Sequence, residues 1–159
     1  MEHCRPATPE DLGRVVELGR ALHGELAPMR GGRIWAAREA RVEPLEPALA
    51  ALLNDPDAAV LVGTIDEAIV GFGVMVLETL STGERLARIT ELFVEEPARA
   101  IGVGEAICDE LVAFAVQRRC VGVDAVALPG HRATKNFFED QGFTARALVM
   151  HRPAGPDER

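Results

Sequence analysis

The chain has 159 residues, of which 48% are hydrophobic and 26% are charged, and its formal net charge is −8. This is the length of one ordinary domain, which buries enough surface to fold without disulfides or a structural metal. The acidic balance, with 4% aromatic residues and no tyrosine, argues against a nucleic-acid surface, because such a surface needs a basic stripe and stacking platforms. The same charge suits a cationic small molecule, or merely keeps the protein soluble.

The N-terminus and the cysteines indicate a cytoplasmic protein. Residues 1–13 lack the apolar core of a signal peptide. The three cysteines are Cys4, Cys108 and Cys120. They form neither a C-x-x-C pair nor a zinc-ligand spacing, so we expect free thiols in a reducing compartment and no metal. The apolar run 58–77 contains Asp66 and Glu67 at its middle, which suits a hairpin turn and argues against a membrane span.

The first third of the chain predicts one strand and two helical regions. Residues 3–6 can form a short strand, and residues 8–11, TPED, have the chemistry of a helix start. Apolar residues then follow at helical spacing as far as Gly24. A second helical region is expected over residues 33–54, interrupted or kinked at its two prolines. The glycine- and proline-rich connection, residues 25–32, is either a substrate lid or a plain surface loop.

The rest of the chain predicts most of a sheet and two more helices. We expect three antiparallel strands joined by short turns, then a helix, a strand, a short helix and a closing strand. In chain order these are expected at residues 59–62, 69–77, 86–94, 106–119, 121–128, 132–141 and 145–151. The order βααβββαβαβ predicts an α/β fold with a mixed, mostly antiparallel sheet of about six strands and about four helices on its two faces. We expect one domain over residues 1–152 and a disordered tail over residues 153–159.

Residues 99–104 read RAIGVG and lie between a predicted strand and a predicted helix. Glycine weakens a helix, so Gly102 and Gly104 must provide either a positive φ or room for a close approach by another group. Unpaired N–H groups and the helix dipole at such a place bind anions such as a pyrophosphate. The pattern is neither a dinucleotide-binding G-x-G-x-x-G nor a P-loop. A tight turn without a ligand is the alternative.

Two motifs carry a resemblance to a known family. Residues 94–104, VEEPARAIGVG, match V-x-x-P-x-R-x-x-G-x-G, and residues 137–143, FFEDQGF, form an aromatic-rich helix that ends in Gly-Phe. In this order and at this separation the motifs resemble those of the GNAT superfamily of acetyl-CoA-dependent N-acetyltransferases, over nearly the whole chain. The resemblance implies the GNAT fold, acetyl-CoA as co-substrate and no metal. It implies these cofactor-binding residues: Leu92, Phe93, Val94, Arg99, Ala100, Ile101, Gly102, Val103, Gly104, Glu105, His131, Asn136 and Phe138.

The resemblance also implies how these residues act. Main-chain amides of residues 99–105 would hold the pyrophosphate. The pantetheine arm would pair like an extra strand with residues 92–94, where a bulge splays the sheet in this family. The backbone N–H of Val94 or Phe93 would stabilise the negative charge that develops on the acetyl oxygen. His131 stands where the family commonly has a cofactor-contacting asparagine.

Glu91 is the candidate general base. An alkylammonium has a pKa of about 10, so the acceptor amine must lose a proton before it attacks. Along its strand Glu91 alternates in phase with Ile89 and Phe93, which predicts that the three side chains share a face. A carboxylate here is similar to the base of many family members. The alternatives are a water chain as the base, and a Glu91 that is solvated or paired with Arg88 or Arg85.

Two departures from the family pattern affect the prediction. The second motif commonly carries a tyrosine that donates a proton to the CoA sulfur, but Phe138 has no proton to give. The chain also ends soon after its last expected strand, which would leave an open sheet edge and favours a homodimer. Glu78, near the end of its strand, is the reserve contact for an acceptor ammonium.

Three functions therefore remain open from the sequence. The first is N-acetylation of a primary amine on a small molecule, and an acidic lining from Glu25, Glu78 and Glu91 would favour a cationic acceptor. The second is N-acetylation of a protein or peptide. The third is a catalytically weak CoA-binding sensor or partner subunit, which the missing tyrosine leaves open.

Overall fold

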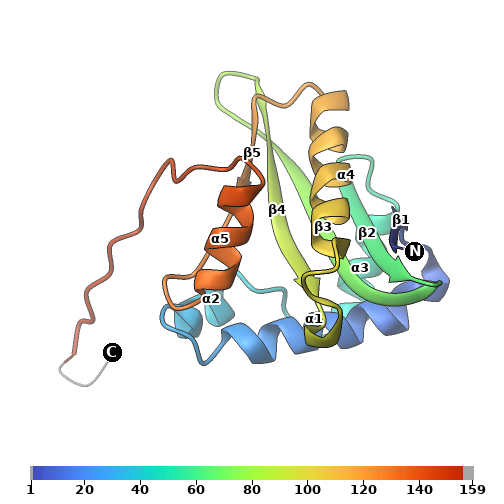
Figure 1. Ribbon diagram of the computed structural model, residues 1–159. Coiled ribbons are helices and arrows are strands. Elements are labelled where there is room, and N and C mark those ends of the chain that lie inside the picture. The colour runs from blue at the N-terminus through green and yellow to red at the C-terminus, as the bar shows by residue number, and fades with distance from the viewer. Residues whose placement is uncertain (1, 156–159) are drawn as a thin grey trace.

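The computed structural model describes residues 2–155 and contains a five-stranded sheet in the order β1-β2-β3-β4-β5 (Figure 1). The first four strands are antiparallel neighbours, and β5 pairs parallel to β4. The strands are β1 (Glu2–Pro6), β2 (Ala58–Ile65), β3 (Ala68–Thr79), β4 (Arg85–Val94) and β5 (Gly122–Ala125). The helices are α1 (Leu12–Leu26), α2 (Gly32–Arg38), α3 (Leu45–Leu53), α4 (Val103–Gln117) and α5 (Arg132–Asp140). Short 3-10 turns cover Pro9–Asp11 and Glu96–Ala98.

Helices cover both faces of the sheet, as the sequence predicts. On one face, α1 and α3 pack against alternate residues of β2, β3 and β4, among them Val62, Phe72 and Phe93. On the other face, α4 packs against Met75 and Ile89, with α5 contributing at the edge. The predicted mixed α/β class is therefore confirmed, and burying these apolar faces is the main favourable term in folding.

Glycines let α4 lie close to the sheet. A Cβ on Gly63 of β2 would stand 2.4 Å from the Val103 side chain, and one on Gly73 of β3 would stand 2.6 Å from Ile107. Real Cβ atoms do not approach so closely, so a larger residue would push the helix away. The close packing fixes the N-terminus of α4 beside the end of β4, where RAIGVG lies.

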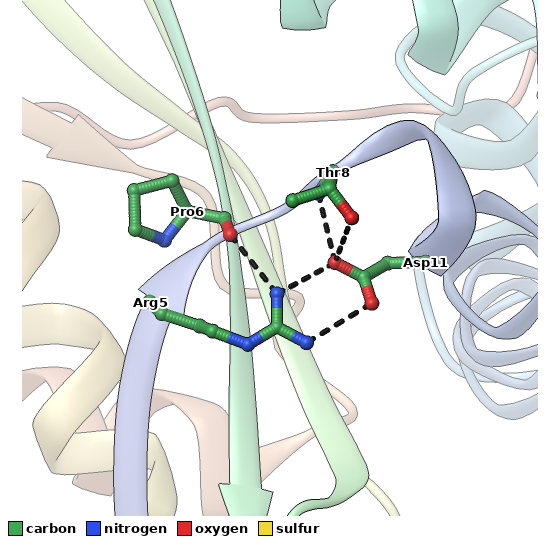
Figure 2. Close-up of polar contacts among 4 residues, drawn as sticks. All are labelled: Arg5, Pro6, Thr8 and Asp11. Atoms are coloured by element: carbon green, nitrogen blue, oxygen red, sulfur yellow. Dashed lines mark hydrogen bonds and ion pairs between the residues drawn. The ribbon is translucent and has the colours of Figure 1, made fainter.

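The start of α1 is fixed by Asp11 (Figure 2). Its carboxylate accepts hydrogen bonds from the Thr8 N–H at 2.8 Å and from two nitrogens of Arg5 at 2.7 and 3.0 Å. The Arg5 hydrogen bond is the largest cause that lowers the pKa of Asp11 to about 2. The Thr8 hydroxyl donates to the same carboxylate. The predicted stripe of α1 is confirmed as buried: Leu12, Val15, Val16, Leu18 and Leu22.

Three predicted elements are present with bounds that differ from the expected ones. The helix expected to end near Gly24 continues to Leu26, and the second helical region is two helices, α2 and α3, separated by residues 39–44. The strand expected over residues 121–128 covers only Gly122–Ala125. The interruption agrees with the one predicted at Pro44, which is the N-cap of α3 and disfavours a helical conformation at the residue before it, whereas Pro47 lies in the first turn of α3 and does not break it.

The prediction of a closing strand over residues 145–151 is wrong. This segment has no strand pairing within residues 2–155 and runs away from the body of the protein (Figure 1). Arg146 donates to Asp124 of β5 at 2.8 Å, so a side chain rather than the main chain attaches it to the sheet. The segment has strand-forming residues but no partner for their N–H and C=O groups, and propensity alone does not supply one. Of the expected tail, residues 156–159 lie outside the described residues.

No helix in residues 2–155 is long and apolar enough to cross a bilayer.

Candidate active site

A bulge at Thr90 divides β4 into two parts. Across β3 and β4, Val74 faces Glu91 whereas its neighbour Met75 faces Ile89, so Thr90 is an extra residue on β4. Such a bulge reverses the faces to which the following side chains point. Ile89 accordingly packs in the core beneath α4 and Phe93 in the core beneath α1. The expectation that Glu91 shares a face with both residues is therefore wrong for Ile89, and the bulge is the reason.

Beyond the bulge, one edge of β4 has no strand beside it in the described chain. Pairing with β5 begins at Leu86 opposite Gly122 and ends at Ile89 opposite Ala125. Residues 91–94 pair only with β3. In Figure 1 helices α4 and α5 stand on either side of this part of β4, and α1 runs beneath it. The backbone there can accept a partner that is not part of the sheet.

A cavity of about 390 Å³ lies at this edge, and we call it the β4–α5 cavity. It brings together most of the predicted cofactor-binding residues from β4, α4, α5 and the preceding turns. Its lining contains Leu22, Glu25, Leu92, Phe93, Val94, Ala98, Arg99, Ala100, Gly104, Glu105, His131, Ala133, Thr134, Asn136, Phe137, Phe138 and Asp140. Ile101, Gly102 and Val103 are not in this lining: they shape the turn that leads into α4.

The two glycines of RAIGVG serve different purposes. Gly102 precedes α4 with φ of 105°, and Ala100 before it also has a positive φ of 66°. Gly104 has no unusual φ, but its Cβ would stand 3.2 Å from the Phe137 ring. The first internal hydrogen bond of α4 runs from the Ala106 N–H to the Gly102 carbonyl at 3.0 Å. The amides before Ala106 therefore remain available to an anion.

The Arg99 side chain ties this turn to β4 and α1. Its Nε donates to the Val94 carbonyl at 2.7 Å and its Nη2 to Glu25 Oε1 at 2.8 Å, while the guanidinium lies 5.3 Å from the centre of the Phe93 ring. Glu25 Oε2 is also 3.3 Å from His131 Nε2. Glu25, at the end of α1, thus holds two residues of the β4–α5 cavity, so its charge is not free to make that cavity acidic.

Helix α5 supplies the wall of the cavity. Phe138 is 8% exposed and makes ring contacts with Phe137 and Phe143 at centroid distances of 5.3 and 5.1 Å. Asn136 lies in the same wall, and His131 Nδ1 shares a hydrogen bond with Thr134 Oγ1. At the position of the family tyrosine the structure therefore has a packed phenyl ring.

A second cavity, of about 490 Å³, lies on the α1 side of β4, and we call it the β4–α1 cavity. Glu91 belongs to this one. Its lining contains Gly19, Arg20, Leu22, His23, Gly24, Trp35, Ala36, Ala37, Ala40, Arg41, Val42, Glu43, Leu45, Leu49, Thr90 and Glu91. Leu22 lines both cavities, and Glu91 directly precedes Leu92 on β4, so the two cavities adjoin.

The partner of Glu91 is Arg41, which the sequence analysis missed. Arg41 Nε donates to Glu91 Oε2 at 2.9 Å, and Nη2 donates to Oε1 at 2.8 Å. The expected partners lie elsewhere: Arg85 forms its ion pair with Asp57, and Arg88 is exposed. Arg41 stands between α2 and α3, in a segment without a motif, so no signal in one sequence connects it with Glu91.

Two other expectations concern residues outside these cavities. Glu78 is exposed at the far end of β3, opposite Leu86, and lines neither cavity.

The three cysteines are free and line neither cavity. Burial is the main cause that raises the pKa of Cys4 and of Cys108 to about 11, which keeps both thiols protonated at neutral pH. Residues 2–155 contain no group of His, Cys, Asp or Glu suited to a metal ion.

Comparison with protein families and solved structures gives a consistent result. A model of the acetyltransferase (GNAT) family matches residues 29–143, which is more than half of the chain. No curated protein matches the chain significantly.

Solved structures with the same fold come from proteins of different specificity. The BH1408 protein from Bacillus halodurans has 23% identity and a TM-score of 0.79, with 95% of this chain and 99% of that chain covered. An aminoglycoside acetyltransferase, meta-AAC0020, from an uncultured soil metagenomic sample has 19% identity and a TM-score of 0.72 (97% and 95% covered) and was solved with sisomicin. A ribosomal-protein-alanine N-acetyltransferase from Brucella melitensis biovar Abortus has 18% identity and a TM-score of 0.70 (98% and 100% covered). At such identities these structures establish the fold alone.

Proposed function

Because this chain belongs to the GNAT acetyltransferase family, we propose that it transfers an acetyl group from acetyl-CoA to a primary amine of a small molecule. The observation that carries the proposal is the pair of adjoining cavities beside one strand. The β4–α5 cavity has the free strand edge and the helix N-terminus that a CoA ester needs, and the β4–α1 cavity holds a carboxylate for the acceptor.

The β4–α5 cavity suits acetyl-CoA through main-chain groups. The pyrophosphate would rest on the unpaired amides at the start of α4, where the helix dipole favours an anion. The pantetheine arm would pair with the free edge of residues 91–94. Helix α5 also carries two exposed basic residues, Arg132 and Lys135, which are neighbours in sequence of lining residues of this cavity. The site needs no metal for this.

Val94 is the better candidate for binding the acetyl oxygen. The Glu95 N–H donates to Val70 of β3 at 2.9 Å, and N–H groups alternate in direction along a strand, so the Val94 N–H points away from β3. The Val94 carbonyl agrees, since it accepts from Arg99 on that free side. The same alternation directs the Phe93 N–H toward β3. A donor at Val94 stabilises the charge that develops as the amine adds.

Glu91 is proposed as the base for the acceptor. An ionised carboxylate has about four lone-pair sites, of which Arg41 uses two, so Glu91 can still accept a proton from an ammonium group or from a water molecule. The amine nitrogen then forms a bond to the acetyl carbon, the bond from that carbon to the CoA sulfur breaks, and the nitrogen loses its second proton to water to give the amide. Since Phe138 cannot donate a proton, the thiolate leaves unaided, which its pKa of about 8.5 permits.

The remaining features of the proposal concern the whole protein. We propose that residues 1–152 form one transferase domain in a cytoplasmic protein, in keeping with its free cysteines. We also propose a homodimer, because Leu148, Val149 and Met150 are 80–89% exposed on a segment without strand partners in the described chain. Sedimentation equilibrium of the full chain tests this: a dimer that dissociates when all three residues are replaced by serine supports it, and a monomer refutes it.

A thiol-release assay tests the activity. Acetyl-CoA is held fixed against polyamines, amino acids, aminoglycosides and short peptides, while calorimetry measures CoA binding. Turnover of one class of small amine supports the proposal. Turnover of peptides alone would make the protein a peptide acetyltransferase, and CoA binding without turnover would favour a sensor.

A further inference from the structure

The Arg41–Glu91 ion pair bears directly on the acceptor. Its side chains are 21% and 11% exposed, whereas Arg20 and Glu43 of the same cavity form a pair that is 61% and 54% exposed. The Arg41–Glu91 pair is therefore largely removed from water, and charges interact more strongly in such a setting. A ligand that reaches this pair meets a positive and a negative group side by side.

Arg41 keeps donors that Glu91 does not use. A guanidinium has five N–H donors, and the contacts of Arg41 engage only Nε and Nη2, the latter also lying 3.4 Å from Thr90 Oγ1. Within residues 2–155 Nη1 has no acceptor, yet it is not among the buried polar atoms that lack a partner. Water therefore reaches Nη1, and a ligand in the cavity can take the place of that water.

Resting on the proposed function, we propose that the acceptor is a free α-amino acid with an apolar or aromatic side chain. The free Nη1 group of Arg41 donates to its carboxylate, and Glu91 receives its ammonium group. The two charged groups of an α-amino acid are separated by a single carbon, so they can reach two side chains that lie next to each other, as Arg41 and Glu91 do. The ion pair and the zwitterion are each neutral, so binding leaves no unpaired charge in the cavity.

The rest of the cavity favours an apolar side chain. The rings of Trp35 and His23 lie 5.9 Å apart in its wall, and Leu22, Leu45 and Leu49 complete an apolar surface. A polyamine or aminoglycoside would instead bring several positive charges next to Arg41 and Arg20. The two carboxylates of this cavity are already paired, Glu91 with Arg41 and Glu43 with Arg20.

Calorimetry on the full chain tests the inference without requiring turnover. With CoA present at saturation, phenylalanine and leucine are compared with phenylalaninamide and leucinamide, which keep the ammonium group but lack the carboxylate. We expect at least one of the two acids to bind about tenfold or more tightly than its amide, as suits a charge-assisted hydrogen bond from Nη1. Equal affinity of acid and amide, or no binding of either acid, would overturn the inference.

Variants assign the discrimination to Arg41. Arg41→Gln should abolish the preference for the acid, and Arg41→Lys, which keeps the charge but loses the planar fork, should retain part of it. The matched control is Arg14→Gln, because Arg14 forms a half-exposed ion pair with Glu95 and lines neither cavity. A preference that survives in folded Arg41→Gln would overturn the assignment. Loss of CoA binding and of all thiol release would refute the proposed function, whereas turnover of amines without preference for a carboxylate would refute only this inference.

Discussion

The two cavities beside β4 are built from different chemical groups of the chain. The β4–α5 cavity relies on backbone: a strand edge without a neighbour, the first turn of α4, and Gly102 with its positive φ. The β4–α1 cavity relies on side chains from α1, α2, the following segment and β4, among them Trp35, Arg41 and Glu91. A CoA ester is a constant co-substrate and can be held by the main chain, whereas an acceptor must be distinguished by side chains.

This difference decides which of the two cavities is visible in a sequence. A backbone site needs specific residues where φ is positive or where another group approaches closely, so it leaves a motif such as RAIGVG. A side-chain site is assembled from distant positions, as Arg41 and Glu91 are. We expect variants in the two cavities to separate acetyl-CoA affinity from acceptor chemistry.

The largest effect is expected for Glu91→Gln. Without a carboxylate to take the proton, kcat should fall about 100-fold, most strongly at low pH, where the amine is hardest to deprotonate. Affinity for acetyl-CoA, measured by calorimetry, should stay within about twofold because Glu91 does not line the β4–α5 cavity. Glu78→Gln, at the exposed end of β3, is the control. An unchanged kcat across the pH range would assign the base to water.

Gly104→Val should produce the opposite pattern. The added side chain meets Phe137, which a Cβ alone approaches to 3.2 Å, and it intrudes where the pyrophosphate would rest. We expect the Kd for CoA to rise about 10- to 100-fold, with the fold retained by circular dichroism. Gly13→Val is the matched control, since a Cβ on Gly13 of α1 meets nothing within 4 Å. Unchanged affinity would mean that Gly104 serves only the packing of α4 against α5.

The carboxylate of Asp11 should have a smaller, pH-dependent effect on the free energy of unfolding, which must be separated from the effect of Glu91 on turnover. Its pKa of about 2 in the fold lies below the ordinary value of 3.8, so its stabilisation is present above about pH 5 and is lost as the pH falls toward 2. Because Arg5 is nearly half exposed, we expect roughly 1 kcal/mol. Urea unfolding at pH 7 and pH 3 should show part of this loss, and the fall in the free energy of unfolding between the two pH values should be smaller in Asp11→Asn than in the native chain.

Asp57→Asn is the comparison for that measurement: the hydrogen bond from Arg85 also lowers the pKa of Asp57, but Asp57 is 46% exposed, so the loss of its carboxylate should change the pH dependence less. If Asp11→Asn keeps the full pH dependence, other carboxylates govern acid stability. A loss of turnover that parallels acid unfolding would then say nothing about Glu91, so the pH profile of Glu91→Gln belongs above pH 5.

Much of the fold could be predicted from the sequence because it depends on local patterns. The stripe of α1, the strands β2 to β4 and the turn at residues 99–104 follow from spacing, capping and glycine placement. The strand expected over residues 145–151 is wrong because strand formation needs a partner that a single segment does not specify. The prediction that Ile89 and Glu91 share a face of the sheet is wrong, because no residue type reliably indicates a bulge in the sequence.

The candidate site divides in the same way. Lining residues of the β4–α5 cavity such as Arg99 and Gly104 were predicted, though the Arg99 contacts with Val94 and Glu25 were not. In the β4–α1 cavity only Glu91 was predicted. Its partner Arg41 lies 50 residues earlier in the sequence, with β2 and β3 between them, so only the fold brings the two together.

The smallest effect is expected for Phe138→Tyr, and it tests whether an acid in the β4–α5 cavity would speed the departure of the CoA thiolate. The substitution adds a hydroxyl to a ring that already packs between Phe137 and Phe143, so the fold should be kept. If the thiolate leaves unaided and its departure does not limit the rate, kcat should change by less than about threefold. A rise of tenfold or more would mean that departure of the thiolate limits the rate in the native protein and that a hydroxyl at residue 138 supplies the acid it lacks.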